Sequence, residues 1–521
     1  MRKLRNLKID ELICYIIIFA ACLKLPNALQ DIGNAVYMIA LVASFFYLFW
    51  KMLWKRELLK NVYHTWGIVL VILFLISAAA NHGLFIVRNL RACICGILFF
   101  FILVPCAGIW SKEAAGEKIH KVNMIIITST MIYGIIMLFF TIFRGHFYLI
   151  NYSGSMIRIG WNVGRNMGIY AEGNLAGYAS VLSFAVGLVE LVFLKSENMS
   201  SRKTKIFVWA NQIIQSVCVV VSCSRTAYLV TLVILFVYVY VWAKVTGRKR
   251  RLLQGVGICV LGGGILLIIG SMINLLPGII IKPFLINLPE NSFEWVDEGE
   301  NKEAENEEAE NISMTYRILT GEQSVTSVEP IEDVQSIKDQ EGSKPVQAED
   351  EKDQTDIIAT LDKYSSGRLQ LWKSGYKRWK ERPLFGEGLY RADNFIATPS
   401  DDNKGVVNIS YFAMHNDYIQ AYVSGGILGG TAFISYIAYV LLRTKRKFVV
   451  ISENLTIEDR LKVGALLALV IGGLFAGMLL TVNYFDCFAT GAIFWCYFGF
   501  LAKYVETLYA ANCANPKEKS V

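Results

Sequence analysis

The chain has 521 residues, of which 54% are hydrophobic and 13% aromatic, and its formal net charge at pH 7 is +8. This composition excludes an ordinary soluble domain and favours a polytopic membrane protein. A bilayer core about 30 Å thick needs roughly 20 apolar residues for each helical span, and lipid offers no partner for unpaired backbone groups. Long apolar runs therefore predict an all-α membrane helical bundle, whereas the strands of a β-barrel would give short alternating segments.

The apolar runs predict about 12 transmembrane helices. They lie near residues 10–30, 34–50, 62–80, 90–110, 122–143, 173–194, 206–223, 226–243, 253–276, 414–442, 463–481 and 484–507. If the basic N-terminus lies in the cytoplasm, every second connection should be rich in Lys and Arg. Basic residues do gather in these connections, near residues 51–60, 112–121, 195–205, 244–251 and 443–447. We therefore expect cytoplasmic N- and C-termini, and the positive charge requires no nucleic-acid partner.

The cysteines and the first apolar run add two exclusions. Most of the eleven cysteines lie inside apolar spans, so no disulfide framework and no zinc-ligand spacing follows. The first apolar run continues into a polytopic pattern and lacks a convincing cleavage site, which favours a retained helix over a signal peptide.

The spans divide the chain into four regions. We expect a nine-helix N-terminal membrane part at 1–276, a large extracytoplasmic loop before the tenth helix at 277–413, three C-terminal membrane helices at 414–507 and a cytoplasmic tail at 508–521. Residues 290–362 of the loop are acidic and poor in aromatic residues, so we expect this tract to be flexible and to have no catalytic role. Order should resume near residue 364 and continue to residue 413.

Three short outer segments contain arginines and no lysine, which opposes the usual distribution of positive charge. These arginines are Arg88, Arg91, Arg144, Arg158, Arg165 and Arg225. A guanidinium group is planar and permanently charged, and it can grip two phosphate oxygens at once. The alternative is that single arginines meet lipid headgroups, cap helices or snorkel to the interface. Several together favour an anion site, above all at Arg225, which almost no loop separates from the membrane.

The outer segment that precedes the sixth span is long for a hairpin, and we expect its aromatic residues to lie in the interfacial belt. Asn174 follows it at the entrance of the sixth span. This side chain either hydrogen-bonds a sugar or caps the helix, and capping is the favoured interpretation.

A basic amphipathic helix is predicted after residue 364. Ser365 or Ser366 is a suitable N-cap, and Pro383 stops the helix. Its apolar stripe, at positions i, i+3, i+7 and i+10, consists of Leu369, Trp372, Tyr376 and Trp379. Such a helix is expected to lie on the membrane surface with its apolar side down. The turn at 383–388 would then redirect the chain towards the membrane.

The tenth span begins with polar residues. Helical spacing would place His415, Tyr418 and Tyr422 on one face, and Gly426 and Gly429 would let another helix approach closely. A lone histidine at a helix entrance is more often structural than catalytic. Here it follows an arginine-bearing segment directly, which favours a functional role.

Three features, in this order, resemble the O-antigen ligase and polymerase superfamily of bacterial polysaccharide assembly. They are Arg225-x-x-x-Leu229, the Arg368-bearing surface helix with its Pro-Leu-x-Gly-x-Gly turn, and His415-Asn416 followed by nine residues and Gly426-x-x-Gly429. The resemblance covers the core from about residue 174 to residue 483, and the acidic tract departs from the family pattern.

The resemblance implies a twelve-helix enzyme of the bacterial cytoplasmic membrane that assembles cell-surface polysaccharide such as capsule. Its partners would be an undecaprenyl-diphosphate-linked oligosaccharide, an acceptor glycan or glycolipid and membrane lipid, with other polysaccharide assembly proteins as further candidates. It implies no cofactor, no nucleotide sugar and no metal. Carried over by position, Arg225 and Arg368 hold the diphosphate and His415 acts on the acceptor hydroxyl. Further candidate substrate-binding residues on the outer side are Arg165, Asn174, Arg88, Arg91, Asn416 and Tyr418.

The residue types support this chemistry independently. A diphosphate-linked donor has a good leaving group, so the enzyme must align an acceptor hydroxyl, remove its proton and stabilise the charge that develops on the diphosphate. Arginines can do the last task without a metal, and an unperturbed histidine titrates near neutrality. Attack opposite the leaving group would invert the anomeric centre.

Alternatives stay open at this point. The sequence does not separate a polymerase from a ligase, because both use the same donor chemistry. A lipid-linked glycan flippase or other polytopic transporter is a second class, although transporters usually place charged or broken helices near the bilayer midplane. A purely structural assembly partner is disfavoured by the arginines and the histidine.

Overall fold

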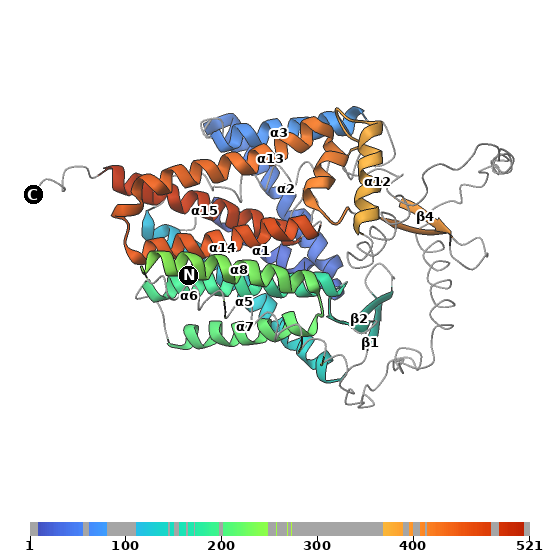
Figure 1. The fold of residues 1–521 in the computed structure, drawn as a ribbon, viewed down its shortest axis with the longest axis horizontal. Coiled ribbons are helices and arrows are strands. Elements are labelled where there is room, and N and C mark those ends of the chain that lie inside the picture. Colours follow the sequence, from blue (N-terminus) through green and yellow to red (C-terminus); the bar gives the residue numbers. More distant parts are fainter. Residues whose placement is uncertain are drawn as a thin grey trace, which may run out of the picture.

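The computed structural model describes residues 9–55, 62–80, 111–143, 146–150, 156–162, 165–170, 172–196, 202–247, 368–388, 395–399, 407–411, 414–480 and 489–514, with isolated residues between 257 and 272. Helices dominate this part of the chain, and most of them run side by side in one bundle (Figure 1). The predicted acidic tract at 290–362 lies outside the described residues.

The long helices of the bundle agree with the predicted spans. They are α1 (Ile9–Lys24), α2 (Gln30–Lys55), α3 (Val62–Ala80), α5 (Lys112–Ile142), α6 (Gly173–Ser196), α7 (Arg202–Val221), α8 (Arg225–Val245), α13 (Asp417–Ile451), α14 (Ile457–Leu479) and α15 (Ala489–Ala514), with the short 3-10 helices η2 (Asn27–Leu29) and η7 (Ser452–Asn454). Seven helices of the described part are long and apolar enough to cross a membrane. The predicted spans at 90–110 and 253–276 lie outside the described residues, and each other predicted span overlaps a helix. A helical protein with several membrane spans is thus confirmed, and the total of twelve stays a prediction.

Two small antiparallel sheets correct the all-α expectation. β1 (His146–Ile150), β2 (Met156–Asn162) and β3 (Arg165–Gly168) form one sheet, and β4 (Phe395–Pro399) pairs with β5 (Val407–Tyr411) in the other. Trp161 was expected in the interfacial belt, but it is buried, and its indole Nε1 donates to the Phe140 carbonyl of α5 at 2.5 Å. Labelled strands of both sheets lie at the same end of the bundle (Figure 1).

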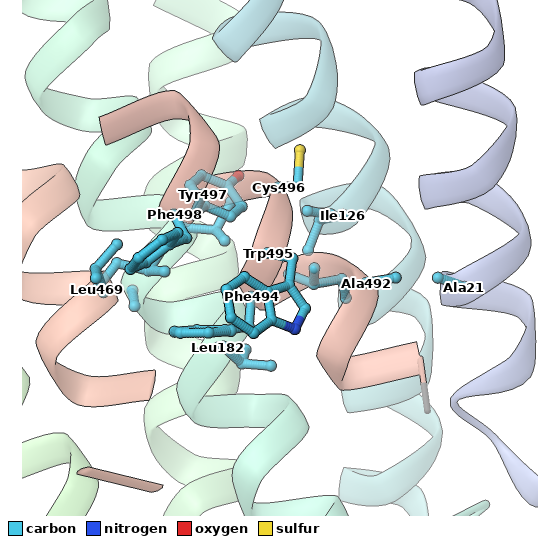
Figure 2. Close-up of a cluster of buried hydrophobic side chains, with 14 of the residues drawn as sticks. Ala21, Ile126, Leu182, Leu469, Ala492, Phe494, Trp495, Cys496, Tyr497 and Phe498 are labelled. Carbon is cyan, nitrogen blue, oxygen red and sulfur yellow. The ribbon is translucent and has the colours of Figure 1, made fainter. Parts of the chain in front are cut away.

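An aromatic cluster on α15 lies in the core of the bundle. The ring centroids of Phe494, Trp495 and Phe498 are 5.1 to 5.9 Å apart. Trp495 also meets Tyr436 of α13 at 6.1 Å. Figure 2 shows the cluster among side chains of α1, α5, α6 and α14, namely Ala21, Ile126, Leu182 and Leu469. Helices far apart in the sequence therefore share one core, which fixes their ends relative to one another.

α13 is interrupted at Gly426, which has a φ of 63° and a ψ of −165°. Such a break leaves backbone groups without helical partners, and the turn at 383–388 supplies these partners. The amides of Glu387 and Gly388 donate to the carbonyls of Val423 and Ser424, and the amides of Ile427 and Leu428 donate to the carbonyls of Pro383 and Leu384. Gly426 was expected to admit another helix, but it admits this turn.

The predicted surface helix is α12 (Arg368–Glu381), and it stands across the end of the bundle that carries the strands (Figure 1). Its packing face is rotated from the predicted stripe. Gly375 lies against Met414 and Ile419, whereas Tyr376 is 53% exposed. The ring of Tyr376 instead lies beside Trp379, with Lys380 4.8 Å from its centroid. The contact of this helix with a membrane surface stays a prediction.

Candidate functional site

The site begins at the corner between α7 and α8. Cys223 has a left-handed backbone with a φ of 50°, so α7 turns into α8 almost without a loop. Ser224 caps α8, because its Oγ accepts a hydrogen bond from the Ala227 amide. The same hydroxyl donates to Oδ1 of Asn174 on α6 at 3.0 Å. Arg225 is thereby held at the first position of α8.

The entrance of α13 forms a second corner. His415 has a φ of 46°, so it lies in a left-handed turn before the helix and not on a helical face with Tyr418. The side chain of Asn416 caps α13 by accepting the amides of Tyr418 and Ile419, and its Nδ2 donates to the Met478 carbonyl at 2.9 Å. Cys223 and His415 are the two non-glycine residues with positive φ in the described part of the chain. Backbone strain of this kind is concentrated at functional sites.

α12 connects these two corners. Arg368, at its first position, donates from Nη2 to Oγ1 of Thr226 at 3.2 Å, directly beside Arg225. One turn later, the indole Nε1 of Trp372 donates to the carbonyl of Met414 at 2.9 Å, directly before His415. The helix therefore fixes both its own arginine and the left-handed turn of His415.

The charges of the site act on one another. Burial lowers the pKa of Arg368, and the neighbouring positive charge of Arg225 lowers it further, while Glu172 opposes the shift. Loss of water raises the pKa of the Glu172 carboxyl, against the opposite effect of Arg165 and Arg368. Since two guanidinium groups repel each other at close range, they are suited to hold an anion between them.

His415 is poised as a neutral base. Burial lowers the pKa of its imidazole below the ordinary value near 6.5, and the positive charge of Arg368 lowers it further. The ring is therefore unprotonated at neutral pH and able to accept a proton. A base, two close arginines and a carboxylate thus meet at the end of the bundle where α12 lies.

The remaining candidates divide into three groups. Arg88 and Arg91 lie outside the described residues. Arg165, at the start of β3, is exposed and acts electrostatically on Glu172. Asn174, Asn416 and Tyr418 all bond within the protein: Asn174 to Ser224, Asn416 at the cap of α13, and the hydroxyl of Tyr418 to the Leu474 carbonyl at 3.0 Å. Asn174 was expected to cap the sixth span, but it lies inside α6, and its side chain accepts the hydroxyl of Ser224, which caps α8.

Sequence reasoning missed three contributors to this geometry. The hydroxyl of Thr226 accepts a hydrogen bond from Arg368, and the Glu172 carboxylate offsets part of the positive charge of the arginines. The indole of Trp372 donates to the carbonyl that precedes His415. Glu172 had one usable signal, because it is an acidic residue in an outer segment that otherwise gathers arginines. The other two contacts join residues far apart in the chain and have no local signature.

Comparison with known protein families gives a match. The family model described as O-antigen ligase matches residues 210–434, a range that includes Arg225, Arg368 and His415. No curated protein matches the chain. The resemblance inferred from the sequence is therefore confirmed.

Proposed function

Because residues 210–434 match the O-antigen ligase family model, we propose that this integral membrane protein is a metal-independent glycosyltransferase. It transfers a glycan from undecaprenyl diphosphate to a sugar hydroxyl of an acceptor glycan or glycolipid. It has twelve membrane helices, lies in the bacterial cytoplasmic membrane with both termini in the cytoplasm, and carries its site on the extracytoplasmic side.

In the proposed reaction, the acceptor hydroxyl oxygen attacks the anomeric carbon of the donor and forms the new glycosidic bond. The bond from that carbon to the diphosphate oxygen breaks, and its electron pair leaves with undecaprenyl diphosphate. His415 takes the proton of the hydroxyl, and Arg225 with Arg368 stabilises the negative charge on the leaving group. Attack from the side opposite the diphosphate inverts the anomeric centre.

One observation carries this proposal, namely that α12 contacts the residues beside Arg225 and beside His415, and that the charge of Arg368 is coupled to each of these two residues. A structural role would not require two arginines to approach each other. Glu172 fits the mechanism as a counter-charge, which limits the repulsion between Arg225 and Arg368 before the donor binds.

The decisive experiment is to incubate the purified protein with an undecaprenyl diphosphate oligosaccharide and to analyse the products. Longer lipid-linked chains identify a polymerase, and transfer to a second acceptor identifies a ligase. Unchanged donor in the presence of every offered acceptor would reject the glycosyltransferase and favour a flippase.

A further inference from the structure

A cavity lies at the other end of α8, away from the candidate site. It has a volume of about 580 Å³ and is lined mainly by residues of α8, α13 and α14. Lys244, near the end of α8, lines this cavity, whereas Arg225 of the candidate site is the first residue of the same helix. At 1.5 Å per residue, about 30 Å separates the two. The cavity is therefore independent of the proposed transfer reaction.

The cavity is lined mainly by apolar residues, with three basic residues among them. Its interior is lined mainly by aliphatic and aromatic side chains, including Val241, Leu441, Phe448, Leu467 and Ile471. Its basic lining residues are Lys244, Lys445 and Arg460. Lys244 and Lys445 are exposed and have no carboxylate partner among the described residues. An amphipathic anion matches this distribution of charge.

The depth of the cavity fits one membrane leaflet. Along α14 the lining extends from Arg460 to Ile471, which is roughly 16 Å at 1.5 Å per residue. Half of the hydrocarbon core of a bilayer is about 15 Å thick. An acyl chain that entered beside Lys244 and Arg460 would therefore fill the cavity along its length.

An unsatisfied hydroxyl points to a polar ligand group as well. Thr444 lines the cavity, is only 6% exposed, and its Oγ1 has no hydrogen-bonding partner in the described part of the chain. A buried hydroxyl without a partner is costly, so a ligand oxygen at this position would be stabilising. The ester groups of a phospholipid lie between its phosphate and its acyl chains and provide such oxygens.

From these observations we propose that the cavity binds an anionic phospholipid of the surrounding leaflet. One acyl chain occupies the apolar interior, the phosphate lies at Lys244 and Lys445, and an ester oxygen accepts the hydroxyl of Thr444. The lipid links α8, which begins at Arg225, to α13, which begins beside His415.

Native mass spectrometry tests this proposal on the purified full-length protein in a neutral detergent, with phosphatidylglycerol and phosphatidylcholine offered in equal amounts. The wild type should retain phosphatidylglycerol preferentially. The double variant Lys244→Gln with Lys445→Gln should retain it roughly 10- to 30-fold less, because each basic residue near a membrane surface contributes on the order of 1 kcal/mol to the attraction. Thr444→Val should also weaken retention, and it breaks no hydrogen bond of the described protein.

The matched control is Lys203→Gln with Lys205→Gln on α7, which makes the same change of charge at exposed positions outside the cavity. This control should retain phosphatidylglycerol as the wild type does, and inorganic phosphate should not displace the lipid. Equal loss in both double variants would overturn the site in favour of general surface attraction. Displacement by inorganic phosphate would overturn the acyl-chain occupant, and unchanged retention in both cavity variants would overturn the whole proposal.

Discussion

His415 has an unusual conformation for a residue that must also do chemistry. Its φ of 46° lies in the left-handed region, where a residue with a Cβ is disfavoured and asparagine is better tolerated. An alanine substitution would therefore mix the loss of a base with a strained turn. His415→Asn keeps the turn and removes the base, so it separates the two effects.

We predict that His415→Asn lowers the rate of glycan transfer by about 10²- to 10⁴-fold, the usual contribution of a general base. The protein should reach the membrane in normal amount and melt at the temperature of the wild type. Both quantities are measured on purified protein, by product analysis and by thermal unfolding. Normal transfer by a folded His415→Asn variant would remove this residue from the mechanism.

The pH dependence of transfer tests the same imidazole. Because the pKa of His415 is lowered, kcat/KM should be level at neutral pH and fall only as the pH drops through a value below about 6.5. Beyond the effect of burial, Arg368 lowers this pKa through its positive charge, so Arg368→Gln should move the acid limb to higher pH and Arg368→Lys should leave it in place. Identical limbs in the two variants would show that Arg368 does not act on the base.

The arginine pair should depend on guanidinium geometry as well as on charge. Arg225→Lys keeps the charge but loses the two-pronged contact with phosphate oxygens. One charged hydrogen bond contributes about 1.5–3 kcal/mol, so we expect kcat/KM to fall roughly 10- to 100-fold. Arg382→Lys, at an exposed position after α12, is the matched control and should keep the wild-type rate. Full activity of Arg225→Lys would contradict a bidentate clamp.

At the scale of elements, the break in α13 determines where α12 lies. The turn at 383–388 bonds to the backbone on both sides of Gly426, and a Cβ at Gly426 would collide with Leu384. Gly429, one turn further along, leaves room at an ordinary contact distance, with Phe74 3.4 Å from the position of a Cβ. The two glycines of one motif therefore have different roles.

We predict that Gly426→Ala lowers the free energy of unfolding by roughly 2–4 kcal/mol, since it combines left-handed strain with the loss of backbone hydrogen bonds. Glycan transfer should fall with it, because α12 carries Arg368. Gly429→Ala should be neutral or slightly stabilising, as alanine favours a helix over glycine. Thermal unfolding of the two purified variants measures the difference, and equal melting temperatures would contradict this role of Gly426.

The helices and strands also show which structural features can be predicted from neighbouring residues in the sequence. The C-terminal end of α12 was predictable, because Pro383 stops the helix locally, whereas the predicted N-cap, Ser365 or Ser366, lies outside the described residues. The break at Gly426 was not, since its cause is the turn at 383–388. The strands around Trp161 were missed because their aromatic residues also suit a membrane interface, and only the contact with Phe140 decides between the two. Likewise, the residue type of Arg368 suggested an anion ligand, a role that stays a prediction, whereas its contact with Thr226 had no signal in the sequence.

At the scale of the whole molecule, the two ends of the bundle differ in charge and chemistry. α12, Arg225 and His415 lie at one end. The other end carries the basic residues at the start of α7, at the end of α8 and in the C-terminal part of α13. The positive-inside rule predicts that this second end lies in the cytoplasm, and the candidate site is then expected to face outwards. This orientation is required by the proposed function, since a lipid-linked glycan is consumed on the extracytoplasmic side.

Cysteine labelling in whole cells checks the orientation. Lys377→Cys on α12 and Lys203→Cys on α7 place single thiols at exposed positions at the two ends, in a background without native cysteines. A membrane-impermeant maleimide should label Lys377→Cys in intact cells, and it should label Lys203→Cys only after the cells are permeabilised. The reverse pattern would place the arginines and His415 in the cytoplasm. Labelling of both in intact cells would contradict the separation of these two positions by the membrane.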